Sequence, residues 1–249
     1  ATRQGHRTRM FLVAVLLGAA RTDMPVRQRI LALHGKGNTG SSFQQRIAPL
    51  VERVGDSADW VFLDAPHPAG ASGFQWWTLE PGVRSFDAEQ YGDVQASLDR
   101  IQQAWDADER GFDAAVGFSQ GAILLSFWIA QGLLARMEGE MVDLPQKAIL
   151  IGAAWPKPYE RAMRALETVP AERFGFIGCD TLHAIGDADD VNPPEQAASI
   201  CRCFGPIGRE LRHGGKHEIP LDSFSLDVMT EFLLELCSSE EECAIPGMD

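Results

Sequence analysis

Short apolar runs alternate with longer amphipathic runs along most of this chain. The apolar runs have the length of strands, and we predict strands at residues 29–33, 60–63, 112–116, 147–152, 181–186 and 209–213. Helices are predicted between and after them, at residues 42–54, 88–105, 122–130, 194–204 and 221–237. Strands that are apolar throughout are typical of parallel sheets covered by helices on both faces. The pattern therefore predicts an α/β fold with a mostly parallel central sheet.

One domain is predicted at residues 25–237, because no internal repeat or break in composition divides them. Within it, residues 69–88 are expected to form a loop punctuated by glycine and proline. An acidic tail follows at residues 238–249. Residues 1–24 are treated as lying outside the domain.

The N-terminal segment differs from the rest of the chain in charge. Residues 1–29 carry six arginines and one acidic residue, whereas residues 30–249 carry 16 basic and 34 acidic residues. An apolar run behind the arginines has the shape of a short signal peptide, and the near absence of acids is also typical of transit peptides. A third interpretation is an extension ahead of Met24. The run is too short to span a membrane as a helix. We expect a cytoplasmic protein, unless residues 1–24 target it to an organelle or to secretion.

Composition excludes several classes of partner and cofactor. The formal net charge of −13 argues against nucleic acid. The five cysteines are odd in number, and Cys201-x-Cys203 has no matching second pair, so we expect reduced thiols and no zinc site. His34 and His67 have no carboxylate or cysteine at ligand spacing. We therefore expect neither a metal nor another cofactor.

The stretch Gly117-Phe118-Ser119-Gln120-Gly121 joins a predicted strand to a predicted helix. A serine on such a sharp strand-to-helix turn has its hydroxyl pushed out of the backbone into a cleft. Glycines flank it because side chains there would clash with neighbouring backbone. The competing interpretation is a glycine-rich turn with an ordinary serine, so the partners of Ser119 decide between the two.

A serine nucleophile needs a histidine base, and the base follows the serine in the α/β-hydrolase arrangement. The histidines after Ser119 are His183, His213 and His217. His183 lies inside an apolar strand and is better explained as a core residue. His217 lies in a glycine-containing loop just before the last helix, where a base can approach the carboxyl edge of the sheet. We therefore select His217, with His213 as the alternative.

The acid that orients the base is expected in a loop after a strand, where catalytic groups of open α/β sheets collect. Asp187, Asp189 and Asp190 all lie in such a loop. Asp190 could be a surface charge and Asp187 could cap the turn. The residues alone do not separate Asp189 from Asp187.

Attack on a carbonyl creates an oxyanion, which needs preplaced backbone N–H donors. One donor is expected at Gln120, directly after the serine, and the other at Lys36, in the loop after the first strand. That loop only partly matches a phosphate-binding glycine pattern, which we regard as the weaker interpretation. Trp76 and Trp77 could wall an acyl pocket, although aromatic pairs more often pack in a core.

Several segments together resemble the family of serine hydrolases (FSH), a branch of the α/β-hydrolase superfamily. They fall in the family's order and cover about residues 26–237: Leu33-His34-Gly35, Trp76-Trp77, Phe112-Asp113, Gly117-Phe118-Ser119-Gln120-Gly121-Ala122, Gly186-Asp187-Ala188-Asp189 and His217-Glu218-Ile219-Pro220. The resemblance implies an α/β-hydrolase fold. It also implies that the acid is the second aspartate of a Gly-x-x-Asp pattern with proline four residues later, which selects Asp189. Lys216 is a departure, because the family usually has glycine before the catalytic histidine.

The resemblance implies a serine hydrolase that cleaves carboxylic ester or thioester bonds of acyl substrates. The catalytic residues would be Ser119, Asp189 and His217, the partner a small-molecule acyl substrate, and no cofactor would be needed. The alternatives are a carboxylesterase similar to acyl-protein thioesterases and lysophospholipases, and a non-catalytic binding module on the same fold.

Overall fold

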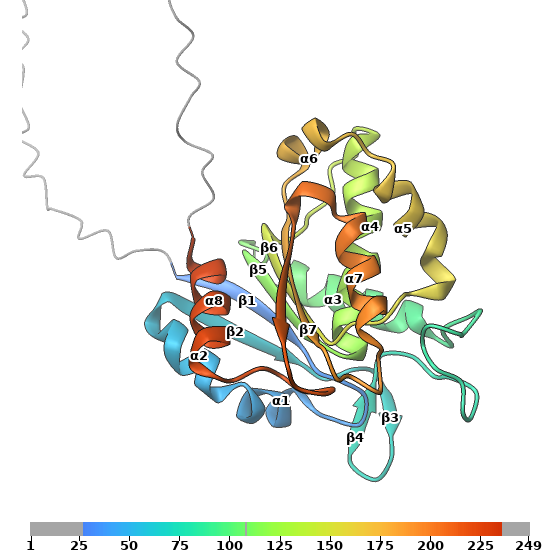
Figure 1. Ribbon diagram of the computed structural model, residues 1–249, viewed down its shortest axis with the longest axis vertical. Helices are drawn as coiled ribbons and strands as arrows, with labels where there is room; N and C mark the ends of the chain where they lie inside the picture. Colours follow the sequence, from blue (N-terminus) through green and yellow to red (C-terminus); the bar gives the residue numbers. More distant parts are fainter. Residues whose placement is uncertain (1–26, 108, 236–249) are drawn as a thin grey trace, which may run out of the picture.

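A parallel sheet forms the centre of the molecule. The computed structural model describes residues 27–107 and 109–235 (Figure 1). Within these residues, six strands pair in the order β2-β1-β5-β6-β7-β8, and every pairing is parallel. The strands are β1 (Gln28–Leu33), β2 (Ala58–Leu63), β5 (Ala114–Phe118), β6 (Lys147–Ile151), β7 (Asp180–Gly186) and β8 (Gly208–His213). The predicted mostly parallel α/β sheet is confirmed.

Helices cover both faces of this sheet. On one face lie α1 (Gly40–Arg46), α2 (Ala48–Val54) and α8 (Ser223–Leu234). On the other lie α3 (Val94–Asp106), α4 (Gln120–Met137), α5 (Glu160–Glu167), α6 (Ala171–Ile177) and α7 (Pro194–Cys203). Each face has its own hydrophobic core, and α4 is apolar on most sides because it is enclosed by the sheet and its helical neighbours.

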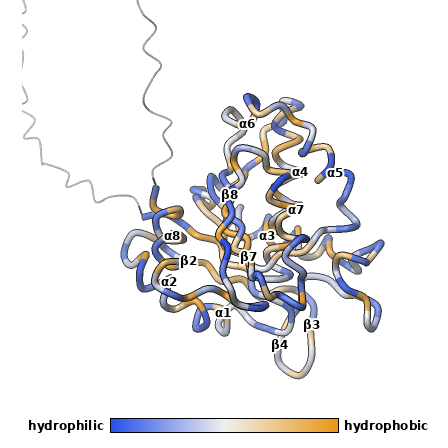
Figure 2. The backbone as a smooth tube through the Cα atoms, in the orientation of Figure 1, coloured by the Kyte–Doolittle hydropathy of each residue, from blue (hydrophilic) through white to orange (hydrophobic). Residues whose placement is uncertain are grey.

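Hydropathy follows the layers. Figure 2 shows hydrophobic colour along the central strands and hydrophilic colour along β8. β8 is an edge strand, and only Leu211 of its residues is buried. Charged side chains on such an edge hinder pairing with a further strand of another chain.

Several predicted boundaries are wrong for local reasons. The single helix predicted at residues 42–54 is two helices, because Pro49 stands in the first turn of α2 and the chain leaves helical geometry at Ile47 (φ −102°, ψ 17°). Helix α3 begins at Val94 rather than at residue 88, after Asp93 adopts a left-handed conformation (φ 54°). The predicted loop at residues 69–88 contains most of a short hairpin.

That hairpin consists of β3 (His67–Ala69) and β4 (Gly73–Gln75), which pair antiparallel. Helices α5 and α6 were not predicted, and three short 3-10 turns complete the elements: η1 (Gly55–Ser57), η2 (Lys157–Tyr159) and η3 (Gly205–Ile207). In Figure 1 the hairpin lies beyond the carboxyl ends of the strands.

Some expectations fall on residues outside the described ranges. These are the N-terminal segment 1–24, the tail 238–249, and Cys237 and Cys243. Cys179, Cys201 and Cys203 are buried. Among the residues described, no helix has both the length and the apolar character needed to cross a bilayer.

Candidate active site

The candidate residues come from loops at the carboxyl ends of four parallel strands. Lys36 follows β1, Ser119 follows β5 and Asp189 follows β7. His217 lies between β8 and α8. Parallel strands bring all of their carboxyl ends to one edge of the sheet, which is why residues far apart in sequence meet there.

Ser119 occupies a strained turn between β5 and α4. Its φ of 53° and ψ of −116° lie outside the regions that non-glycine residues prefer, and among the described residues only Asp93 also has a positive φ without being glycine. A Cβ at position 121 would lie 2.3 Å from the carbonyl oxygen of Leu33, and a Cβ at position 117 would lie 2.7 Å from the backbone N of Ala122. Both flanking glycines are therefore required by close backbone contacts.

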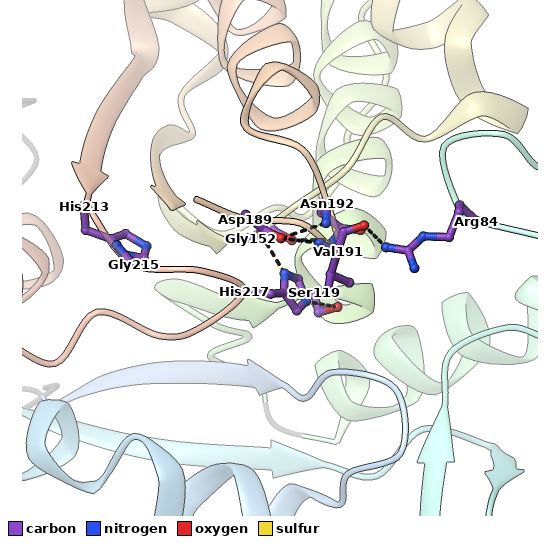
Figure 3. A network of polar contacts seen from close by, with 9 residues as sticks. All are labelled: Arg84, Ser119, Gly152, Asp189, Val191, Asn192, His213, Gly215 and His217. Carbon is purple, nitrogen blue, oxygen red and sulfur yellow. Dashed lines mark hydrogen bonds and ion pairs between the residues drawn. The ribbon is translucent and has the colours of Figure 1, made fainter. Parts of the chain in front are cut away.

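Ser119, His217 and Asp189 form a continuous chain of hydrogen bonds (Figure 3). The Oγ of Ser119 lies 2.9 Å from Nε2 of His217, and Nδ1 of His217 lies 2.7 Å from Oδ2 of Asp189. With the carboxylate ionised, Nδ1 carries the proton and donates it to Asp189, so Nε2 is free to accept from the serine hydroxyl. The three residue types selected from the sequence are thus brought together.

The carboxylate of Asp189 is held from both sides. Its side chain is 1% exposed. While Oδ2 accepts from His217, Oδ1 accepts the backbone N–H groups of Val191 (2.9 Å) and Asn192 (2.8 Å). Three donors satisfy a buried negative charge that would otherwise be costly. The orientation of this carboxylate is therefore fixed before any substrate arrives.

The other two aspartates of this loop point elsewhere. Asp187 is exposed and pairs with the guanidinium of Arg212, at 2.6 Å. Asp190 lies 3.8 Å from Nζ of Lys216, and both of these side chains are largely exposed. The positive charge that Lys216 brings next to His217 is thus directed to Asp190.

His213, the alternative base, lies apart from Ser119 in Figure 3, where its Nδ1 accepts the N–H of Gly215 at 3.3 Å. His183 is fully buried, in agreement with its interpretation as a core histidine. Burial lowers its pKa to about 3. Neither residue contacts the serine.

Two residues of the site were missed in the sequence. Gly152, after β6, has φ 58°, and a Cβ there would lie 3.2 Å from Cε1 of His217. The amide of Asn192 donates to the carbonyl of Gly152 at 2.7 Å, which ties the acid loop to the end of β6. The glycine at the end of a predicted buried strand was the available signal, because a ring that passes over the backbone leaves no room for a side chain.

The loop after β1 fixes the orientation of one peptide unit. Ala65 N–H donates to Nε2 of His34 (3.1 Å), so Nδ1 of His34 is the protonated nitrogen and donates to the carbonyl of Gly35 (2.8 Å). Burial lowers the pKa of His34, which favours this neutral form. The backbone N–H of Asn38 also donates to the Gly35 carbonyl, at 3.2 Å. In a trans peptide the N–H of Lys36 must then point the opposite way.

The N–H groups of Lys36 and Gln120 both belong to residues that line the cleft over Ser119. Neither donates a hydrogen bond to any residue in the described part of the chain. Gln120 is the first residue of α4, where a backbone N–H has no partner within the helix and the helix dipole favours negative charge. The arrangement suits two donors to a developing oxyanion.

Trp76 and Trp77 are both fully buried and neither lines the cleft. Trp76 donates its indole N–H to the carbonyl of His34 (2.7 Å) and its backbone N–H to Oε1 of Gln120 (3.0 Å). The ring of Trp77 stacks on Tyr91, with centroids 4.2 Å apart. The structure thus places both tryptophans in the core behind the site. Of the two roles considered from the sequence, this is core packing and not the wall of an acyl pocket.

The cleft above the serine has a volume of about 380 Å³. Its apolar residues include Leu79, Val83, Ile123 and Val191, and its cations are Lys36, Arg46 and Arg84. Arg84 and Val191 both line the cleft, and Arg84 donates to the carbonyl of Val191 (Figure 3). No group of three metal-ligating side chains that could hold an ion is found within the described residues.

A sequence model described as "Serine hydrolase (FSH1)" matches residues 24–228. The chain belongs to this serine hydrolase family. Among its relatives, Esterase OVCA2 of Xenopus tropicalis is 29% identical, over 82% of this chain and 91% of that protein. Esterase OVCA2 of Bos taurus is 27% identical, over 82% of this chain and 95% of that protein. The family resemblance inferred from the motifs is confirmed.

Solved structures of esterases share the fold of this serine hydrolase. Esterase PE8 aligns with a TM-score of 0.61 and 23% identity, covering 83% of this chain and 91% of that one. Zea mays acyl-protein thioesterase 2 aligns with a TM-score of 0.61 and 20% identity, covering 86% of this chain and 95% of that one. The fold is that of α/β-hydrolases, as expected, and the family makes the chain an enzyme.

Proposed function

We propose that this serine hydrolase cleaves carboxylic esters or thioesters of acyl substrates through a Ser119–His217–Asp189 triad and an acyl-enzyme. The observation that carries the proposal is the unbroken hydrogen-bond chain from Ser119 Oγ through both ring nitrogens of His217 to Asp189. A serine hydroxyl is a weak nucleophile on its own, and this chain supplies the base and orients it.

The proposed reaction has two halves. In the first, Ser119 Oγ forms a bond to the carbonyl carbon while His217 Nε2 takes the hydroxyl proton. The negative charge on the carbonyl oxygen is stabilised by the N–H groups of Lys36 and Gln120. The bond from carbon to the leaving oxygen or sulfur then breaks, and His217 returns the proton to that atom.

In the second half, water attacks the acyl carbon of the ester on Ser119. His217 takes a proton from the water, the oxyanion forms again between the same donors, and the bond from carbon to Ser119 Oγ breaks as the proton returns to the serine. Asp189 stays ionised throughout and stabilises the charged imidazolium. The products are the carboxylic acid and the free enzyme.

The strained backbone of Ser119 supports a catalytic role over a binding module. A non-glycine residue in this conformation costs about 1–3 kcal/mol, which a simple binding surface would have no need to maintain. The esterase names of the relatives support ester substrates. The acyl-protein thioesterase among the structural neighbours keeps a thioesterase of that type as the second candidate.

The extent of the domain, residues 25–237, and a cytoplasmic location are part of this proposal. No metal or other cofactor enters the mechanism. The substrate is proposed to be a small molecule, in keeping with the modest volume of the cleft.

A fluorophosphonate probe tests the proposal directly. It should label the wild type, and Ser119→Ala should abolish both the labelling and turnover of a 4-nitrophenyl acyl ester, with kcat falling by up to about 10⁶-fold. Ser41→Ala is the matched control, because Ser41 is an exposed serine of α1 outside the cleft. Equal labelling of wild type and Ser119→Ala would remove Ser119 from the mechanism.

A further inference from the structure

The cleft over Ser119 has a charge opposite to that of the protein. The whole chain has a net charge of −13. Among the described residues that line the cleft, three are cationic and none is an aspartate or glutamate. A concave site lined by one sign of charge concentrates ligands of the opposite sign. Such a lining therefore favours a substrate that carries an anionic group.

The cations also lack carboxylate partners of their own. Several other arginines form ion pairs with carboxylates, as Arg53 does with Asp227 and Arg212 with Asp187. Lys36 and Arg46 have no ion pair with any residue in the described part of the chain. Their charges are therefore available to a ligand.

The position of Arg46 indicates which part of a substrate it would meet. The ring of Phe118 packs against the ring of His217, with centroids 5.0 Å apart, and the guanidinium of Arg46 lies 4.6 Å from the centroid of the same Phe118 ring. Lys36 follows Gly35, where a Cβ would lie 2.9 Å from Cδ1 of Phe118. Arg46 and His217 thus contact the same Phe118 ring, and Lys36 lines the cleft with them.

The apolar part of the cleft adjoins a different hydrophobic core from that of Phe118. Ile123 and Leu79 belong to the hydrophobic core between the sheet and α4, whereas Phe118 belongs to the core between the sheet and α1 and α8. An acyl chain would find its apolar contacts beside Ile123, Leu79 and Val83. The leaving group must lie beside His217 Nε2, because that nitrogen returns the proton to it.

We propose that the natural leaving group is an alcohol or thiol that bears an anionic group, a carboxylate or a phosphate, bound by Arg46 with Lys36 beside it. This inference rests on the proposed function and narrows its substrate class. Arg84 is left out of the anion site, because its guanidinium already donates to the Val191 carbonyl. The guanidinium of Arg46 offers the paired N–H groups that match carboxylate and phosphate oxygens.

A matched set of substrates tests the proposal. Hexanoyl thioesters of 2-mercaptoethanol, 3-mercaptopropionate and 2-mercaptoethyl phosphate differ in the charge of the leaving group, and the corresponding oxygen esters are measured in parallel. The adipoyl thioester of 2-mercaptoethanol carries its carboxylate on the acyl side instead. For each enzyme, kcat/KM on an anionic substrate is divided by kcat/KM on the neutral one, which cancels effects common to all substrates.

Wild type should prefer the anionic leaving groups by about three- to tenfold at low salt, and the preference should shrink in about 0.5 M NaCl. Arg46→Gln should lose most of that preference. The control is Arg100→Gln, which removes the same charge from an exposed residue of α3 outside the cleft, and it should keep the preference. A larger preference for the phosphate than for the carboxylate identifies a phosphorylated leaving group.

Three results would overturn the anion site: no preference in wild type, an unchanged ratio in Arg46→Gln, or a preference for adipoyl over the anionic leaving groups. The Ser119→Ala variant separates this from the proposed function. If it abolishes turnover of the neutral substrate while the charge ratio is flat, the triad stands and only the anion site fails. If it leaves turnover intact, the triad itself fails.

Discussion

Replacing Asp189 by asparagine changes one atom in the centre of the proposed triad. An asparagine oxygen in place of Oδ1 still accepts the N–H groups of Val191 and Asn192. The amide nitrogen then takes the place of Oδ2, 2.7 Å from His217 Nδ1. Because that nitrogen can only donate, Nδ1 of His217 must become the acceptor, and the ring proton moves to Nε2.

The effect on catalysis follows from the new tautomer. With a proton on Nε2, His217 cannot accept the hydroxyl proton of Ser119, which lies 2.9 Å away. The imidazolium would also lose its buried counterion. We expect kcat to fall by about 10⁴-fold, or about 5.5 kcal/mol of transition-state stabilisation. The fold should persist, because both backbone N–H groups keep an acceptor.

Asp187→Asn is the matched control, since it makes the same chemical change two residues earlier. Asp187 and Arg212 are about half exposed, so losing their pair should cost at most about 1 kcal/mol of unfolding free energy and leave turnover near wild type. Turnover of a 4-nitrophenyl ester and the midpoint of urea unfolding are measured for both variants. If Asp189→Asn kept a tenth or more of wild-type kcat, or if Asp187→Asn were the worse of the two, Asp189 would not be the acid.

Further predictions concern the serine turn and the acid sensitivity of the core. Gly121→Ala should lower the unfolding free energy by about 2–3 kcal/mol and slow fluorophosphonate labelling, because its Cβ would lie 2.3 Å from the Leu33 carbonyl oxygen. A Cβ at Gly175, in α6, would meet open space, so Gly175→Ala should instead raise the unfolding free energy by about 0.5–1 kcal/mol. Equal effects of Gly121→Ala and Gly175→Ala on urea unfolding would refute the steric explanation. Burial lowers the pKa of His183 to about 3, so this side chain is neutral in the folded protein. In the unfolded chain it binds a proton below about pH 6.5. The stability that the neutral side chain contributes is therefore present above that pH and is lost as the pH falls. Between pH 7 and pH 5 the loss of unfolding free energy from this residue amounts to about 2 kcal/mol. In urea titrations at the two pH values, His183→Gln should therefore lose about 2 kcal/mol less unfolding free energy than the wild type. An equal loss in both proteins would mean that His183 titrates normally.

Much of the fold could be predicted because its signals are local. Apolar runs of strand length, such as residues 147–151 and 181–186, are buried on both faces and pair in parallel as expected. Helix boundaries were predicted wrongly where a single residue sets them, as Pro49 does between α1 and α2. The short hairpin of β3 and β4 escaped prediction because its strands are three residues each and carry little pattern.

The candidate site likewise contains residues that could be predicted from local sequence and residues that could not. Ser119 is apparent in the sequence, because flanking glycines and a strand-to-helix change mark the turn within a few residues. The choice of Asp189 over Asp187 came from family resemblance alone, since both follow the same strand. Gly152 and Asn192 were not found, because their role depends on a contact between loops that are 40 residues apart.

What the sequence by itself determined is the layered α/β fold, the serine on its turn and the order in which the triad residues follow. These depend on periodicity and on backbone requirements within short windows of the chain. Only the tertiary structure decided which aspartate faces His217, that the two tryptophans lie behind the cleft, and that cations line the cleft. Those properties depend on which loops meet at the carboxyl edge of the sheet and on where each side chain points once they have met.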